Sequence, residues 1–265
     1  RRRATLGRLV AWPDGVRRRA DTNARDKPAS SGRGTATFSW LREFADGMGR
    51  HALDRFMWDF TMSLPDARTR NMFMLHELFH RIQPELGLVT LKGQNAHLDT
   101  LEGRIWLRLE WRALARALGQ SGEDRKRAVN DAAGFRLARR SQFDNSAENE
   151  RREEITEGLA QYTGTVAATV SHAEAVASAM EQLASAEEHE TFLQQAYTAG
   201  VAYGILLDDA SPDWRRSVRG DSDLGRMLVA ALDVTPSKDA VEASGSYAGP
   251  ELPTPEETRA RQRTP

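Results

Sequence analysis

Residues 72–82 read MFMLHELFHRI, and this stretch combines a helical spacing of apolar residues with two histidines, His76 and His80, four positions apart. Residues at positions i and i+4 lie on the same face of an α-helix, about one turn apart. Pro84 follows closely, and proline is poorly tolerated beyond the first turn of a helix. The stretch therefore predicts a short, largely apolar helix with both imidazoles on one face.

The five residues from His76 to His80 form an HExxH motif. Two imidazoles in this arrangement can bind one zinc ion, and Glu77 between them can reach a metal-bound water as a general base. The chain contains no Cys, so a zinc site in it must be completed by His or carboxylate side chains. We therefore expect a Zn²⁺ cofactor, with His76 and His80 as ligands and Glu77 as the catalytic base.

The composition is that of an ordinary globular chain: of 265 residues, 40% are hydrophobic and 28% are charged, and the formal net charge is −1. This balance gives no overall field that would favour nucleic acid or an anionic membrane. No apolar run approaches the roughly 18 residues needed to cross a bilayer. We therefore expect a peptide or protein substrate, no nucleic-acid partner and no membrane span, while oligomeric state and compartment stay open.

The composition changes along the chain and divides it into three parts. Residues 1–36, rich in Arg, Gly and Ser, predict an irregular basic arm, and residues 37–233 predict a single catalytic domain. Residues 234–265 hold five of the ten prolines and predict a tail or linker. The chain begins with Arg1 instead of Met and closes on a stretch that could start another helix. We therefore expect both ends to be incomplete, and export after removal of a signal peptide stays open.

Helical spacing of apolar residues dominates the chain after residue 68. The predicted helices cover 95–118, 123–143, 148–170, 172–186 and 191–207, with shorter ones at 212–218 and 224–232. The many arginines of 123–143 are expected on the solvent side of their helix. Residues 54–64, dense in aromatic side chains and Met, have strand character. The predicted fold class is mainly α, with a small N-terminal β element at most.

A zinc enzyme needs a third protein ligand, with the fourth position left to water. The extended metzincin motif would place a His six residues after His80, but position 86 is Leu, so that arrangement is excluded. Glu157 is the best candidate, because the sequence turns from charged to apolar at this point and a carboxylate there can face a core. Gly158 beside it would let another helix or the metal approach closely. Glu153 and Glu154 are the alternative ligands.

HELFH at 76–80 followed by TEGLAQY at 156–162 resembles the zinc helix and glutamate helix of gluzincin metallopeptidases. The glutamate motif is most similar to that of the aminopeptidase branch of this family. Tyr197, at the head of the sequence Tyr-Thr-Ala-Gly, is similar to a Tyr-x-x-Gly stretch in those enzymes. The resemblance implies a zincin-like helical catalytic domain. It also implies roles for five residues, namely zinc ligation by His76, His80 and Glu157, base catalysis by Glu77, and oxyanion stabilisation by Tyr197.

The chain also departs from the gluzincin pattern. His80 and Glu157 are 77 positions apart, a longer gap than is common in the family, so we expect the two intervening helices to form an insertion that folds away from the metal. The aminopeptidase stretch Gly-x-Met-Glu-Asn is absent, so the resemblance does not extend to exopeptidase specificity. Position 161 is Gln where thermolysin-like members have an Asp that orients a His. Another acceptor is then needed, and the candidates are Asp99, Glu102 and Glu153.

These observations predict a zinc-dependent metallohydrolase, with a peptidase as the preferred interpretation. One alternative is a zinc hydrolase of a non-peptide amide or ester, and another is a metal-binding scaffold without turnover. A third is a helical interaction protein in which the HExxH motif arose by chance. Tyr203 and His172 compete with Tyr197 for the oxyanion role.

Overall fold

The chain folds into a set of helices that pack around one another. The computed structural model describes residues 64, 66–88, 93–189, 191–192 and 195–248, and the predicted arm at 1–36 and almost all of the segment 54–64 lie outside these residues. The elements are α4 (Ala67–Ile82), η2 (Ala96–Asp99), α5 (Leu101–Gly119), α6 (Gly122–Arg140), α7 (Ser146–Glu153), the π-helix η3 (Glu154–Gly158), α8 (Leu159–Ala168), α9 (His172–Ala186), α10 (Gln195–Ala210), α11 (Trp214–Ser217), α12 (Leu224–Leu232) and α13 (Ala240–Ser244). Within the described part of the chain there is no strand, which confirms the mainly α prediction.

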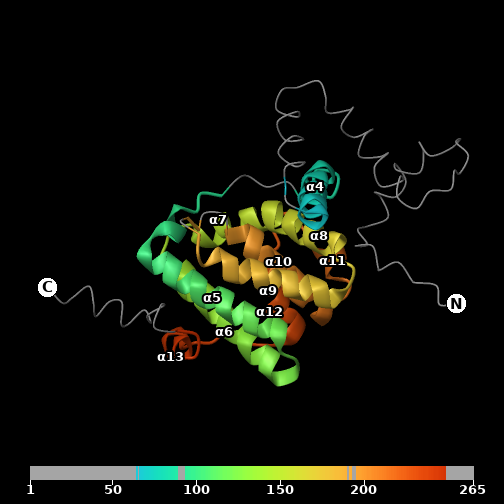
Figure 1. Ribbon diagram of the computed structural model, residues 1–265. Helices are drawn as coiled ribbons and strands as arrows, with labels where there is room; N and C mark the ends of the chain where they lie inside the picture. The colour runs from blue at the N-terminus through green and yellow to red at the C-terminus, as the bar shows by residue number, and fades with distance from the viewer. Residues whose placement is uncertain (1–63, 65, 89–92, 190, 193–194, 249–265) are drawn as a thin grey trace, which may run out of the picture.

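Helix α10 is the centre of the molecule (Figure 1). Its sequence up to Leu207 carries no charged side chain and many small ones, and nearly every residue in it is buried. A helix that is apolar on all sides is stable only when other elements surround it. The elements that contact α10 are α5, α8, α9, α12 and η3.

Two close helix contacts depend on glycine. Gly158 of η3 and Gly200 of α10 face each other, and a Cβ atom added to either would clash with the backbone of the other helix. Gly164 of α8 lies in the same way against the backbone of α4 at Met72. Because glycine has no side chain, the backbones can approach closely at both points. These contacts bring the three helices that carry the predicted site residues together.

Side-chain caps mark where several of the helices begin. Ser171 and Asp223 each accept a hydrogen bond from a backbone amide three residues on, and they start α9 and α12 at the predicted residues. The predicted helix at 95–118 instead starts at Leu101, because Thr100 caps it by accepting from the Gly103 amide. The preceding residues, Ala96–Asp99, form a separate 3₁₀ turn.

The helices between His80 and Glu157 are part of the core, so the expectation of an insertion that folds away was wrong. Helices α5 and α6 pack closely along each other, and α5 also contacts α9 and α10. Three side chains of α5, namely Trp106, Leu109 and Leu114, are at most 2% exposed. The long gap in the sequence therefore encodes the scaffold on which the other helices rest.

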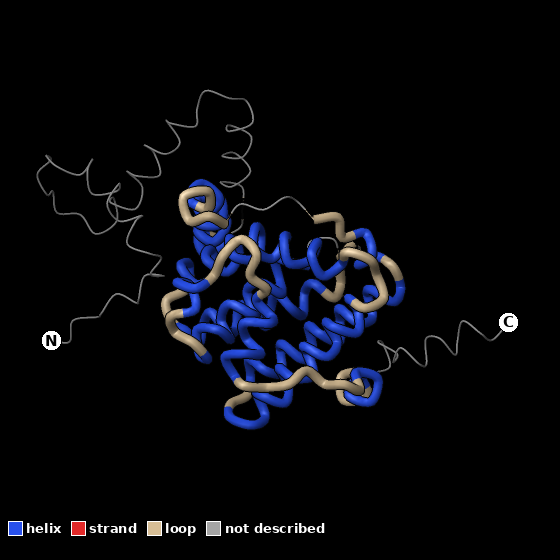
Figure 2. The backbone as a smooth tube through the Cα atoms, turned by 180° about the vertical axis from the view of Figure 1, so that it is seen from behind, coloured by secondary structure: helices blue, strands red, loops and turns tan. Residues whose placement is uncertain are grey.

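The described part of the predicted tail also packs on the domain (Figure 2). Residues Ala240–Ser244 form α13, which contacts α6. The ring of Tyr247 lies edge-on to Phe135, with 5.4 Å between ring centroids, and its hydroxyl donates to Asp131 at 2.8 Å. The domain boundary expected at residue 233 therefore moves beyond Tyr247.

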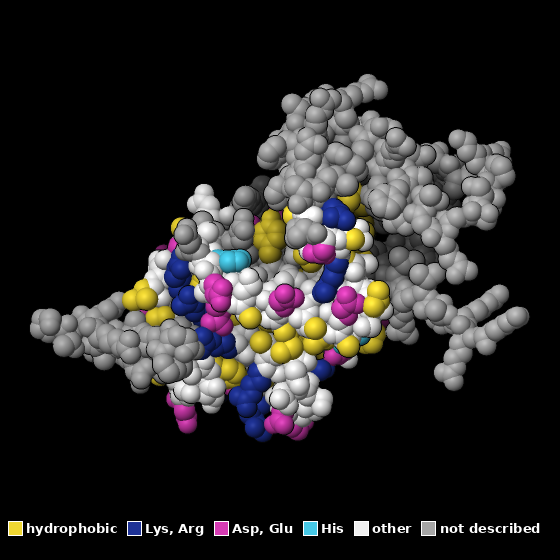
Figure 3. Space-filling view, in the orientation of Figure 1, with side chains coloured by type: hydrophobic (Ala, Val, Ile, Leu, Met, Phe, Trp, Pro, Cys, Tyr) yellow, Lys and Arg dark blue, Asp and Glu magenta, His cyan; other side chains and the backbone are white. Residues whose placement is uncertain are grey.

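The visible surface carries charges of both signs. On the face shown in Figure 3, Lys and Arg side chains are interspersed with Asp and Glu and do not gather into one patch. In the part of the chain that the structure describes, no helix is both long and apolar enough to cross a membrane.

Candidate metal centre

Helix α4 presents both histidines of the HExxH motif to the rest of the molecule. The Asp66 side chain accepts from the Thr69 amide at 2.9 Å and starts the helix, which then runs to Ile82. Phe79, on the same side of the helix, is buried at 1% exposure. The His76 side chain is buried as well, whereas that of His80 is 26% exposed. The pair thus lies at the edge of the core, with one side open to solvent.

Glu157 comes from η3 and completes a group of three candidate metal ligands. The Nε2 atoms of His76 and His80 lie 3.0 Å apart. The Oε2 atom of Glu157 lies 3.3 Å from the first and 3.2 Å from the second. Residues 77 positions apart in the sequence therefore converge on one point. The alternative ligand Glu154 is fully buried and paired with Arg136, so it does not belong to this group.

The spacing of the three atoms is compatible with a tetrahedral zinc ion. Zinc binds nitrogen and oxygen at about 2.0–2.2 Å, which places two ligands of a tetrahedron about 3.3 Å apart. The distances of 3.0, 3.2 and 3.3 Å form a nearly equilateral triangle of that size. The residues therefore fit a zinc ion with three protein ligands and one free position.

Each histidine also has an acceptor on its other ring nitrogen. The Nδ1 atom of His76 lies 3.0 Å from Gln161 Oε1, and the Nδ1 atom of His80 lies 2.7 Å from Gln83 Oε1. An acceptor at Nδ1 holds the hydrogen there and leaves the Nε2 lone pair free for a metal. The acceptors are therefore two glutamines, and the expectation that Asp99, Glu102 or Glu153 supplies them was wrong for both rings. Asp99 instead contacts the connection between α9 and α10, where it accepts from the Thr191 hydroxyl and the Phe192 amide.

Gln83 links His80 to the π-helix. Its Nε2 atom donates to the carbonyl oxygens of Ile155 at 3.1 Å and Thr156 at 2.8 Å, both within η3. A carbonyl can only accept, so these bonds fix the amide with its oxygen toward His80. A π-helix interrupts the regular pattern of backbone hydrogen bonds and is frequent at functional sites. One side chain therefore orients a candidate ligand and also satisfies the backbone that carries Glu157.

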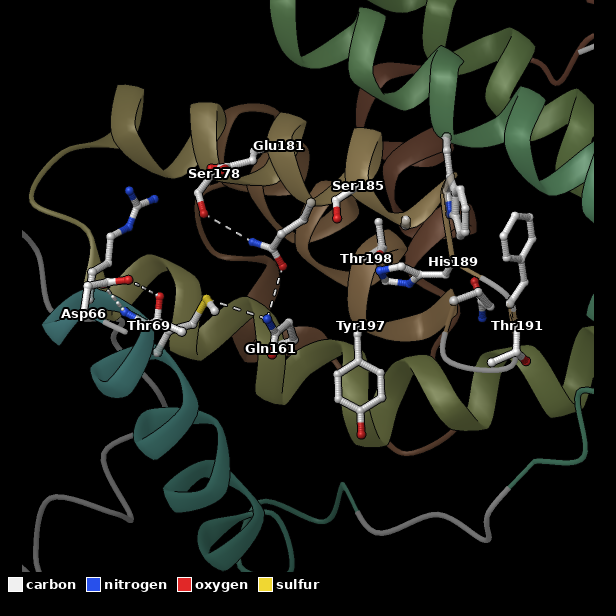
Figure 4. Close-up of a pocket in the computed structure, with 17 residues that line it drawn as sticks. Asp66, Thr69, Gln161, Ser178, Glu181, Ser185, His189, Thr191, Tyr197 and Thr198 are labelled. Carbon is white, nitrogen blue, oxygen red and sulfur yellow. Dashed lines mark hydrogen bonds between the residues drawn. The ribbon is translucent and has the colours of Figure 1, made fainter. Parts of the chain in front are cut away.

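Gln161 is fixed by other polar side chains. Its Nε2 atom donates to Gln182 Oε1 at 3.1 Å, and Gln182 donates in turn to Ser178 Oγ at 3.3 Å (Figure 4). This row of hydrogen bonds connects α8 to α9. It holds the Gln161 oxygen toward His76 in the position where thermolysin-like enzymes use an aspartate.

Tyr197 lies directly against the candidate ligands. Its ring stacks on His76, with 5.4 Å between centroids and an angle of 5° between the ring planes. Its hydroxyl hydrogen-bonds to the Glu157 carboxylate. Glu77 is near enough that its charge raises the pKa of both His80 and Tyr197. All five residues singled out by the sequence are thus brought together.

The electrostatics of the group keep Glu157 ionised and Tyr197 protonated. Burial raises the pKa of Glu157, but its contacts with His76, His80 and Tyr197 outweigh this effect and hold that pKa well below its ordinary value. The hydrogen bond to Glu157 is the main cause of a raised pKa at His80. Burial, followed by the hydrogen bond to Glu157, raises the pKa of Tyr197. Near neutral pH, Glu157 is therefore an anion suited to a cation, and Tyr197 keeps its proton for donation.

The competitors for the oxyanion role lie elsewhere. The Tyr203 hydroxyl is fully buried and donates to Glu110 at 2.7 Å. The His172 ring is half exposed and faces Asp209 at 3.1 Å. Of the three candidates, only Tyr197 touches a candidate metal ligand.

A buried ion-pair cluster supports the helix that carries Glu157. Arg136 and Arg139 of α6 were expected to face solvent, but they are 3% and 0% exposed. The guanidinium of Arg136 binds Glu110 at 3.0 Å and also pairs with Glu154, and Arg139 binds Glu150 at 2.8 Å. The signal in the sequence was Glu110, a carboxylate within the apolar run of α5 that needs a buried cation. This cluster attaches α7 and η3 to the α5–α6 pair.

No protein-family description, no curated protein and no solved structure matches this chain.

Proposed function

We propose that this chain is a zinc-dependent metallohydrolase, with peptide-bond hydrolysis as its reaction and a catalytic arrangement that resembles that of gluzincin peptidases. One observation carries the proposal. His76 Nε2, His80 Nε2 and Glu157 Oε2 form a triangle with sides of 3.0, 3.2 and 3.3 Å, and Glu77 and Tyr197 lie beside it. A chance HExxH motif gives no reason for a carboxylate 77 positions away to meet both imidazoles.

In the proposed reaction, His76, His80 and Glu157 would hold a zinc ion, which would supply the Lewis acidity needed to acidify a water and to polarise the substrate carbonyl. Glu77 accepts a proton from the attacking water and returns it to the leaving amine. The Tyr197 hydroxyl, which stays protonated, donates to the oxygen on which negative charge develops. Gln83 and Gln161 keep both imidazoles in the tautomer that leaves Nε2 free.

The first test is the metal content of the purified protein, measured by inductively coupled plasma mass spectrometry. We expect one zinc per chain in the wild type and in His172→Ala, which removes a half-exposed histidine that faces Asp209 and is not one of the three ligands. We expect loss of zinc in the double variant His76→Ala, His80→Ala, and weaker binding in Glu157→Ala. Equal zinc content in all four proteins, or none in the correctly folded wild type, would rule out the centre.

The second test separates an enzyme from a metal scaffold. Glu77→Gln keeps the three ligands and removes the base, so zinc content should stay at one per chain. Hydrolysis of a quenched fluorescent peptide library should fall by about 10²- to 10⁴-fold, the usual contribution of general base catalysis. If peptide cleavage is as fast in Glu77→Gln as in the wild type, the activity does not arise at this site.

A further inference from the structure

A groove of about 580 Å³ runs along α9 beside the candidate metal centre. The start of α4, the connection between α9 and α10, and parts of α5, α8 and α10 complete its lining. Figure 4 shows Asp66 at one end of the groove and Thr191 at the other, with Gln161 and Tyr197 between them. Asp66 and Thr191 are both exposed, so both ends of the groove reach the surface.

One face of α9 forms a polar wall of this groove. Ser178, Gln182 and Ser185 follow one another at spacings of four and three residues, which places them in one row along the helix, with Glu181 beside them. The side chains of Glu181 and Ser185 have no hydrogen-bond or ion-pair partner within the described part of the chain. Hydroxyl and amide groups both donate and accept, as does a peptide main chain with one N–H and one C=O per residue. The wall therefore suits a main chain better than one particular side chain.

The groove meets the candidate metal centre at Gln161 and Tyr197. The Oε1 atom of Gln161 faces the His76 ring at 3.0 Å, and its Nε2 atom donates to Gln182 on the polar wall at 3.1 Å. Tyr197, which also lines the groove, stacks on the same ring with 5.4 Å between centroids. A chain bound in the groove would therefore pass beside the proposed oxyanion donor.

The groove continues on both sides of this point. At one end Arg68 pairs with Glu174, near the start of α9, at 3.6 Å, and at the other end His189 follows the last turn of that helix. Gln182 lies eight residues after Glu174 and seven residues before His189. Along the axis of α9 this corresponds to about 10–12 Å on each side of Gln182. An extended chain advances about 3.3–3.6 Å per residue, so about three residues of it fit on each side.

The charges of the lining do not favour a chain terminus. A site for the terminal amine or carboxylate of a substrate would hold an opposite charge close to the metal. Arg68 instead lies at one end of the groove and is paired with Glu174, and Asp66 at the same end caps α4. Glu181 is nearer the middle, but it is exposed, and an ion pair there is screened by water and contributes little. The lining therefore favours an internal segment over a terminus.

We propose that this groove binds the main chain of an extended polypeptide on both sides of the bond that is hydrolysed, so that the substrates are internal segments of polypeptides. In the described part of the chain no strand offers an edge with which a substrate could pair. The polar face of α9 would supply those hydrogen bonds instead, with Ser185 as an available donor and acceptor. This inference gives the substrate class of the proposed peptidase and rests on that function.

The first experiment varies the length of the substrate. Quenched fluorescent peptides built on one cleaved library sequence have both termini blocked, by acetylation and amidation, and extend for one to four residues on each side of the scissile bond. We expect kcat/KM to rise by about 10-fold or more from one to three residues on either side and to change little beyond three, because remote parts of the substrate contribute binding energy. A gain on one side only, no gain, or cleavage restricted to peptides with a free terminus would overturn the proposal.

Two variants of α9 connect this length dependence to the groove. Ser185→Trp places a large ring in the groove, and Ala184→Trp is the matched control, because Ala184 is also exposed on α9 but does not line the groove. We expect the gain with length to fall to about 2-fold or less in Ser185→Trp and to persist in Ala184→Trp, with the same circular dichroism in both. A gain that is unchanged in Ser185→Trp would contradict the groove.

Glu181→Gln tests whether this carboxylate binds a terminal amine instead. We expect cleavage of the blocked peptides at the wild-type rate, since a main chain needs no charge at this position. A wild-type preference for free amines that disappears in Glu181→Gln would identify an aminopeptidase and overturn the proposal.

A binding measurement separates the groove from the proposed function. Fluorescence anisotropy follows a labelled, blocked octapeptide of Ala and Ser added to Glu77→Gln, which is expected to bind without cleaving. We expect binding to weaken by about 10-fold or more when Ser185→Trp is added and to stay the same when Ala184→Trp is added. If no peptide is cleaved by the wild type but this pattern holds, the peptidase function fails and the groove stands. If peptides are cleaved but Ser185→Trp does not weaken binding, the function stands and the groove fails.

Discussion

Gln83 shows how much of the candidate centre depends on a single neutral side chain. Its amide oxygen faces His80 at 2.7 Å, and its amide nitrogen covers two carbonyls of the π-helix. Gln161 performs only the first of these tasks, for His76. Neither role is visible in the sequence, because a glutamine three residues after a histidine has no distinctive pattern, and Gln161 meets His76 only through the packing of α8 on α4.

We expect Gln83→Leu to weaken zinc binding by about 10- to 100-fold, the usual effect of losing the hydrogen-bond partner of a metal ligand. The same change leaves the Ile155 and Thr156 carbonyls without their donor and should lower the free energy of unfolding by about 1–3 kcal/mol. Gln161→Leu is the matched comparison, since it removes a partner of His76 and a donor to the Gln182 side chain without uncovering a backbone carbonyl. Chelator competition and urea unfolding measure the two quantities. Equal stability losses in the two variants would contradict the second role of Gln83.

At the scale of the elements, the junction of α7, η3 and α8 determines where Glu157 lies. The sequence predicts one helix over 148–170, whereas the structure contains a π-helix at Glu154–Gly158 within it. The spacing of apolar residues in the sequence cannot reveal this π-helix, because a π-helix shifts the helical pattern by only one residue. Among the helices that begin with a side-chain cap, α9 and α12 have the bounds that the sequence predicts, whereas α5 begins at Leu101 instead of residue 95.

Gly158→Ala tests this junction, because the added methyl group would press against Gly200 and the Ala196 carbonyl of α10. We expect the free energy of unfolding to fall by about 1–3 kcal/mol, the usual cost of overpacking. Zinc affinity should fall with it, because Glu157 is the adjacent residue. Gly119→Ala is the control, since its methyl group would meet only the end of Met180 at 3.9 Å and should have little effect or stabilise slightly. Similar results for the two variants would show that the α10 contact does not require glycine.

At the scale of the whole molecule, the α5–α6 pair is the scaffold, and buried charges attach the glutamate-bearing helices to it. The mainly α class followed from apolar spacing, but the inward direction of Arg136 and Arg139 did not. Arginines in a polar helix predict a solvent-exposed face. That these two are buried becomes clear only from their partners, Glu110 on α5 and Glu150 on α7. The sequence thus predicts which residues form the candidate centre better than it predicts what holds them in place.

Asp223 gives this cluster a measurable pH dependence. Burial raises the pKa of Asp223, but Arg136 and Arg140 outweigh it and hold the pKa well below its ordinary value of 3.8. A carboxyl group with a lowered folded-state pKa stabilises the fold above its unfolded-state pKa, and this contribution disappears as the pH falls toward the folded-state value. Asp223→Asn retains a side-chain cap for α12 and removes the charge.

We therefore expect Asp223→Asn to be less stable than the wild type at pH 7 by about 2 kcal/mol, less than the roughly 3–5 kcal/mol for breaking a buried ion pair, because Arg136 and Arg140 keep Glu154 and Glu150 as partners. The difference should shrink as the pH falls below about 4, where the wild-type carboxyl begins to gain a proton in the unfolded state. Urea unfolding between pH 7 and pH 3 measures both effects. A difference that stays constant over this range would show that the charge of Asp223 does not contribute.

The packing of α4 has a consequence for chain topology. Helix α4 has α8 as its main neighbour in the described part of the chain, yet it supplies two of the three candidate ligands. A metal bound by His76, His80 and Glu157 would close a loop of 77 residues in the chain, between His80 and Glu157. Its coordination bonds would attach α4 to the rest of the helices. Such a cross-link lowers the conformational entropy of the unfolded chain more than that of the folded chain, and it therefore stabilises the fold. Removal of zinc should therefore release α4 first, with hydrogen exchange rising along Ala67–Ile82 while α5 and α10 stay protected. The helix that binds the ion would in turn be held in its place by it.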